Sequence, residues 1–103
     1  MTILEKDNNI IIKLPKDLIE DGINTLKSEL ENYNFKGKIE AFKSKNMHII
    51  IDSSSVINID FFGYQHIYGF CYFIKKKLEF DNLKAENKSD SFINFEKKYG
   101  LYI

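Results

Sequence analysis

Short runs of β-branched and alternating apolar residues predict the first strands of this chain. Ile3–Lys6 and residues 9–14 flank the turn-forming Asp7-Asn8-Asn9, which is typical of a hairpin. Pro15 then ends the second strand. We therefore expect the chain to open with two antiparallel strands.

The most apolar strand pattern lies in the middle of the chain. Within His48–Asp52, the run Ile49-Ile50-Ile51 is apolar on both faces, which is typical of a central parallel strand. Residues 79–85 predict a fourth strand. Residues 101–103 predict either a very short fifth strand or a tail packed against the core.

Helical spacing of apolar residues predicts three helices. The first follows Asp17, which we expect to be its N-cap, and residues 62–78 form the second and longest, with Asp60 as its N-cap. Residues 88–99 form the third, with Gly100 suited to the position just past its end. Residues 32–46 carry a poor pattern and predict an irregular connection with room for one helical turn.

The predicted order is β-β-α-β-α-β-α, with an optional last strand. Alternation of this kind predicts an α/β fold in which three or more helices cover a mixed sheet of four to five strands. A length of 103 residues fits one domain, 1–103.

Composition excludes several classes of function. Fifteen basic residues balance fifteen acidic ones, and every basic residue is lysine, so bidentate arginine contacts to nucleic acid are absent. Cys71 is the only cysteine, which argues against a disulfide or a structural zinc site. Neither a signal peptide nor an apolar run long enough for a bilayer is present. We expect a cytoplasmic protein that binds no nucleic acid and does not insert into a membrane.

Residues with chemical potential form no recognisable catalytic or metal pattern. His48 and His66 lie on different predicted elements without a metal-ligand partner, and Ser53-Ser54-Ser55 lacks a nucleophile elbow. Gly63 and Gly69 do not have the spacing of a phosphate-binding loop. Asp52 at a strand end resembles the phosphorylated residue of a response-regulator receiver, but the acidic pair and the lysine of that site are missing. We expect neither enzymatic activity nor a cofactor.

The segment HIIIDSSSVINIDFFG, residues 48–63, resembles the central signature of STAS domains, the anti-sigma-factor-antagonist family. Asp52 matches the aspartate that ends the family's strand, Asp60 the helix-capping aspartate, and Gly63 the glycine of the family's Asp-Ser-Ser-Gly motif. Asp17 stands where the family tends to place an acidic residue. The resemblance implies a STAS-like fold and a role in bacterial partner-switching signalling.

The sequence departs from this family at the phosphorylation site. Phosphorylatable members carry a serine or threonine just before the motif glycine, and here that position is Phe62, preceded by Phe61. Because neither side chain has a hydroxyl, a switch that adds about two negative charges at this position is excluded. The resemblance therefore implies a domain that is not phosphorylatable there.

A helical wheel of residues 62–78 separates two faces. Ile67, Cys71, Ile74 and Leu78 share the face expected in the core, with Tyr64 and Phe70 at its margins. The opposite face collects Phe62, His66, Gly69 and Phe73. Two interpretations stay open. In the first, the helix is buried on both sides or its register is off by one residue. In the second, this face is an exposed aromatic surface that binds a protein. Under the second, the partner-binding residues are Asp60, Phe61, Phe62, Gly63, His66, Gly69 and Phe73.

The leading hypothesis is a non-catalytic scaffold or regulator that docks onto an anti-sigma-factor-type kinase, a sensor complex or a copy of itself. The alternative is an accessory STAS-like subunit of a membrane transport system, with a transporter subunit as partner. A third possibility is a small-molecule sensor, which no residue pattern specifically supports.

Overall fold

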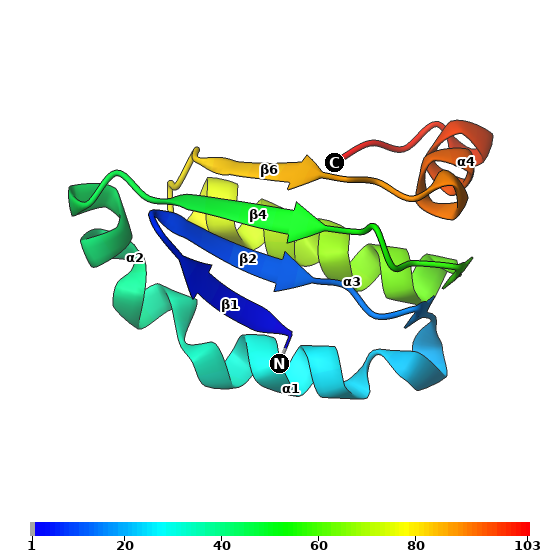
Figure 1. Ribbon diagram of the computed structural model, residues 1–103, viewed down its shortest axis with the longest axis horizontal. Coiled ribbons are helices and arrows are strands. Elements are labelled where there is room, and N and C mark those ends of the chain that lie inside the picture. The colour runs from blue at the N-terminus through cyan, green and yellow to red at the C-terminus, as the bar shows by residue number, and fades with distance from the viewer. Residues whose placement is uncertain (1) are drawn as a thin grey trace.

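The computed structural model describes residues 2–103, which form an α/β fold with a mixed four-stranded sheet (Figure 1). The strand order is β1-β2-β4-β6, in which β1 is antiparallel to β2 while β2, β4 and β6 are parallel. The bounds are β1 (Ile3–Lys6), β2 (Asn9–Lys13), β4 (His48–Asp52) and β6 (Leu83–Glu86). The predicted class, hairpin and central parallel strand are confirmed.

Strand register explains why the isoleucine runs form the centre of the sheet. Ile10 lies opposite Ile49 and Ile12 opposite Ile51, and all four are fully buried. Their alternation places one continuous apolar layer on one face of the sheet. This layer is the side against which the helices pack.

Four α-helices complete the fold, and α3 passes behind β4 and β6 in Figure 1. The bounds are α1 (Asn24–Tyr33), α2 (Phe35–Ser44), α3 (Phe61–Tyr72) and α4 (Asp90–Tyr99), with a 3-10 turn η1 (Glu20–Gly22) and a π-helical turn η2 (Phe73–Lys77). Within residues 2–103, no helix combines the length and the apolar character that crossing a membrane would require.

The predicted ends of the last helix are confirmed within two residues. Ser89 caps α4 by accepting a hydrogen bond from the Phe92 amide, at 3.1 Å, and Gly100 follows the helix with a φ of +65°. Only the left-handed region offers this φ, and glycine adopts it without strain.

The prediction that Asp17 caps a helix is wrong. Asp17–Leu18 is instead a short strand, β3, which pairs in parallel with β5 (Asn58–Ile59), and α1 begins only at Asn24. The Asp17 carboxylate accepts a hydrogen bond from the Asn58 side-chain amide, at 2.6 Å. A partner distant in sequence therefore takes the aspartate that local pattern assigned to a helix.

The segment 32–46 is more regular than predicted. Asn34 adopts the left-handed conformation and its side chain accepts a hydrogen bond from the Gly37 amide, which starts α2. Phe35, Ile39 and Phe42 are buried on one face of this helix. At the other end of the chain, residues 101–103 form no strand.

A buried ionic network holds α4 and the end of the chain against α3. Glu96 is only 4% exposed, and its carboxylate accepts hydrogen bonds from the Tyr64 hydroxyl (2.6 Å), the Lys88 ammonium (2.7 Å) and the Ile103 amide (2.9 Å). Lys88 also donates to the main-chain oxygen of Ile103. Three partners for one carboxylate compensate its removal from water.

Candidate protein-docking surface

The start of α3 is fixed by Asp60, as predicted. One carboxylate oxygen of Asp60 accepts a hydrogen bond from the Gly63 amide at 2.8 Å, and the other accepts one from the Glu20 amide at 3.3 Å. The aspartate therefore caps α3 and also ties η1 to it. Both oxygens of its carboxylate thus accept hydrogen bonds from the main chain, and Asp60 is half-buried.

Gly63 brings the first turn of α3 against β3. A Cβ at this position would lie 1.9 Å from the main-chain oxygen of Leu18, so only glycine allows this contact. Gly63 is buried. Although Gly63 belongs to the predicted set of partner-binding residues, it packs against Leu18 beneath the exposed rings and cannot contact a partner directly.

The core face of α3 matches the helical wheel. Ile67, Cys71 and Ile74 are buried and Leu78 is partly buried. Of the two marginal residues, Tyr64 is buried as well, and Phe70 lies edge-on to Phe35 of α2 with 5.1 Å between ring centroids.

The opposite face of α3, continued by the first residue of η2, is exposed and carries an unusual number of rings. We call it the aromatic face; it consists of Phe61, Phe62, Tyr68, Tyr72 and Phe73. Between 39% and 56% of each residue is exposed. No charged residue occurs between Asp60 and Lys75 to favour contact with water. The interpretation in which this helix is buried on both sides is therefore wrong.

Part of the aromatic face is held in place by α4. The Phe61 ring lies 5.3 Å from Phe95 and 4.4 Å from Tyr99, measured between centroids. These contacts pack one side of the Phe61 ring against α4 while leaving about half of the residue exposed. A ring already ordered in the free protein loses less entropy when a partner covers it.

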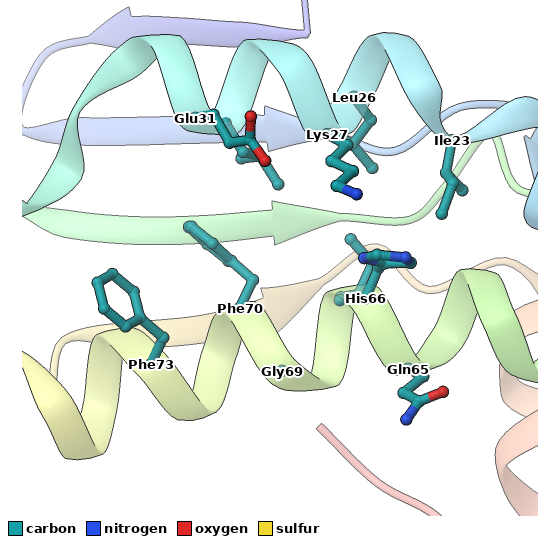
Figure 2. A pocket seen from close by; sticks show the side chains of 11 residues that line it. Ile23, Leu26, Lys27, Glu31, Gln65, His66, Gly69, Phe70 and Phe73 are labelled. Carbon is teal, nitrogen blue, oxygen red and sulfur yellow. The ribbon is translucent and has the colours of Figure 1, made fainter.

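A groove runs along the other side of the aromatic face, between α3 and α1 (Figure 2). It encloses about 300 Å³, and a neighbouring hollow of about 310 Å³ shares Leu30, Glu31, Phe70 and Phe73 with it. Gly69 lies in the groove, and a Cβ added to it would meet nothing within 4 Å, so the backbone of α3 is accessible there. This α1–α3 groove is apolar along its floor, with Lys27 and Glu31 of α1 at its rim (Figure 2).

The structure brings together most of the predicted surface and adds residues to it. Phe62, His66, Gly69 and Phe73 are all exposed, and His66, Gly69 and Phe73 line the groove. Tyr68 and Tyr72 were missed, although their spacing from Phe61 on a helical wheel places them on the same exposed arc. The α1 wall was missed because nothing local in the sequence shows which helix lies beside α3.

Of the remaining reactive groups, Cys71, Tyr64 and Ser53 are buried, whereas Ser54 and Ser55 are exposed. Burial raises the pKa of the Cys71 thiol to about 11, against a lowering effect of Lys75. Burial, with the hydrogen bond to Glu96, also raises the pKa of Tyr64. Asp52 accepts a hydrogen bond from the Ser54 amide. Among residues 2–103, no group of three acidic, histidine or cysteine side chains is placed to hold a metal ion.

No protein-family model, curated protein or solved structure matches this chain. The role of the aromatic face is therefore inferred from its geometry and chemistry alone.

Proposed function

We propose that this chain is a non-catalytic protein-interaction domain that binds its partner through the aromatic face and the α1–α3 groove. The observation that carries this proposal is the exposure of five aromatic rings on a helix segment without charge. Exposed apolar surface on a soluble protein can mark an interaction site, and aromatic residues are enriched at the centre of protein interfaces.

Two further features support a macromolecular partner. The groove is open along α1 and α3, which suits an extended or helical segment of another protein. Because Gly69 has no side chain, a partner backbone can approach α3 closely at that position. Lys27 and Glu31 on the rim offer one charge of each sign for orienting the partner.

The resemblance to STAS domains suggests the kind of process in which this docking takes place. Three of the positions on which the resemblance rests support the proposal: Asp52 ends β4, Asp60 caps α3, and Gly63 packs in the first turn of that helix. Under this resemblance Phe62 stands where phosphorylatable members carry a serine or threonine, and it is 56% exposed. We propose a scaffold or regulator of bacterial partner switching that engages its partner without phosphorylation at this site.

Affinity capture from lysates of the source cells, followed by titration of the purified partner, tests the proposal. Phe62→Lys and Phe73→Lys each remove a ring from the surface, and the loss of about 2 kcal/mol typical of an aromatic hot spot weakens binding about thirtyfold. Leu4→Lys is the matched control, because Leu4 is comparably exposed, at 43%, but belongs to β1.

Unchanged affinity in both phenylalanine variants would refute the docking role of this surface. If Leu4→Lys lost binding and the phenylalanine variants did not, the partner would bind at β1 of the sheet and not at the aromatic face. Capture of a transporter subunit in place of a signalling protein would favour the transport alternative while leaving the surface as proposed.

A further inference from the structure

Strand β6 forms one edge of the four-stranded sheet, and within residues 2–103 it pairs only with β4 (Figure 1). Exposed strand edges carry unpaired backbone groups that can accept another strand. The chain end, residues 101–103, runs beside the end of β6 but makes no backbone hydrogen bond to that strand.

The register with β4 shows which backbone groups face outward. The Ile49 amide donates to the Asn82 carbonyl at 2.8 Å, and Ile49 lies opposite Leu83. In a parallel ladder the backbone groups alternate in direction, so Lys84 turns toward β4 while Leu83 and Ala85 turn away. The free edge therefore offers the N–H and C=O groups of Leu83 and Ala85.

We propose that two copies of this chain pair through their β6 strands, antiparallel, about a two-fold axis at Ala85. Each Ala85 amide then donates to the Ala85 carbonyl of the other copy, which is the closely spaced hydrogen-bonded pair of an antiparallel ladder. The two four-stranded sheets become one continuous sheet. An interface of this kind uses the same patch on both copies.

Charge complementarity selects this register. Pairing about Ala85 places Lys84 opposite Glu86 of the second copy, and Glu86 opposite its Lys84. Lys84 and Glu86 already form an ion pair of 3.2 Å on one face of β6, so the four charges alternate in sign around the axis. The neighbouring symmetric registers place Lys84 opposite Lys84 or Glu86 opposite Glu86, which like-charge repulsion disfavours.

Exposed rings beside the edge supply apolar surface for the same contact. Tyr68 and Tyr72 of α3, with Tyr102 of the chain end, line a hollow of about 200 Å³ next to Leu83 and Ala85. Tyr102 is 80% exposed. The aromatic face is thereby divided: Tyr68 and Tyr72 lie near the second copy, and Phe62 and Phe73 remain free on the groove side.

The test compares Lys84→Glu, Glu86→Lys and their mixture by sedimentation velocity and light scattering. Each variant alone places like charges opposite each other twice, which should raise the dimer dissociation constant at least about tenfold. An equimolar mixture restores both opposite-charge pairs, so a heterodimer should form. Lys43→Glu is the matched control, because it disrupts an exposed ion pair with Glu40 on α2 and should leave self-association unchanged.

A wild-type protein that stays monomeric at high concentration would overturn the proposal, as would a dimer unaffected by both charge reversals. Failure of the mixture to associate would exclude the Ala85-centred register. Phe62→Lys should not affect self-association, so failure of this proposal and failure of the partner-binding proposal are distinguishable.

Discussion

Two glycines on α3 should respond in opposite directions to the same substitution. In an open helix position, replacing glycine by alanine is favourable by about 1 kcal/mol, because alanine restricts the unfolded chain and has the higher helix propensity. Gly69 is such a position, since nothing lies within 4 Å of an added Cβ. We expect Gly69→Ala to raise the melting temperature by about 4–8 °C in a domain of this size.

At Gly63 the same methyl group has no room. Its Cβ would lie 1.9 Å from the Leu18 carbonyl oxygen, and an ordinary contact begins at 3.4 Å, so α3 and β3 must separate by roughly 1.5 Å. Such overpacking typically costs about 1–3 kcal/mol, occasionally more, and here it also misaligns the Asp60 cap. Gly63→Ala should therefore lower the free energy of unfolding.

Thermal melting and urea denaturation, each followed by circular dichroism, compare both variants with the wild type. A stabilising Gly63→Ala would refute the close contact between α3 and β3, and a destabilising Gly69→Ala would refute the openness of the groove at that position. Gly69→Ala should in addition weaken partner binding, because the new methyl group projects into the groove.

Three further predictions concern the groups that hold the surface in place. Asp60→Ala should lower the free energy of unfolding by about 1–2 kcal/mol in urea denaturation while Asp60→Asn retains most of it, and equal losses would argue against capping. Glu96→Leu should lower the free energy of unfolding by about 3 kcal/mol, because it removes the counterion of the largely buried Lys88 ammonium and leaves that group only its hydrogen bond to Ile103. The double variant Glu96→Leu/Lys88→Met should be more stable than the single one, and equal melting temperatures would contradict this. Burial raises the pKa of the Cys71 thiol to about 11, so above about pH 8.5 the native state keeps a proton that the unfolded chain releases. The free energy of unfolding should therefore be constant below about pH 8.5 and fall by up to about 1.4 kcal/mol per pH unit above it. A flat profile up to about pH 10.5 in urea denaturation would contradict the burial of the thiol.

Much of the fold follows from local pattern where apolar periodicity is strong. Ile49-Ile50-Ile51 needs burial on both faces whatever surrounds it, and Asp60 followed by a long apolar helix leaves little freedom for the start of α3. These features were predictable because the information lies within a few residues of each position.

The features that were mispredicted depend on contacts distant in sequence or on a signal that polar residues obscured. Asp17 joins a strand pair whose other member, Asn58, lies 41 residues away. In α2 the helical spacing of Phe35, Ile39 and Phe42 was present, but Asn34 and Gly37 are typical helix breakers, and here they form the start of the helix. The α1–α3 groove requires the packing of two helices and has no local signature.

The helical wheel predicted part of the exposed aromatic face. The wheel placed Phe62 and Phe73 opposite the core, and the structure exposes both. The wheel could not show that Phe61 packs against α4, because the contact joins it to Tyr99, 38 positions further along the chain.

The most direct test of the docking surface is photo-crosslinking in the source cells with benzoylphenylalanine placed at single positions. Substitution at Phe62 or Phe73 should give one discrete adduct with a second protein, and substitution at Leu4 should give none. If neither α3 position forms an adduct, or if Leu4 gives the same one, the aromatic face is not where this protein meets its partner.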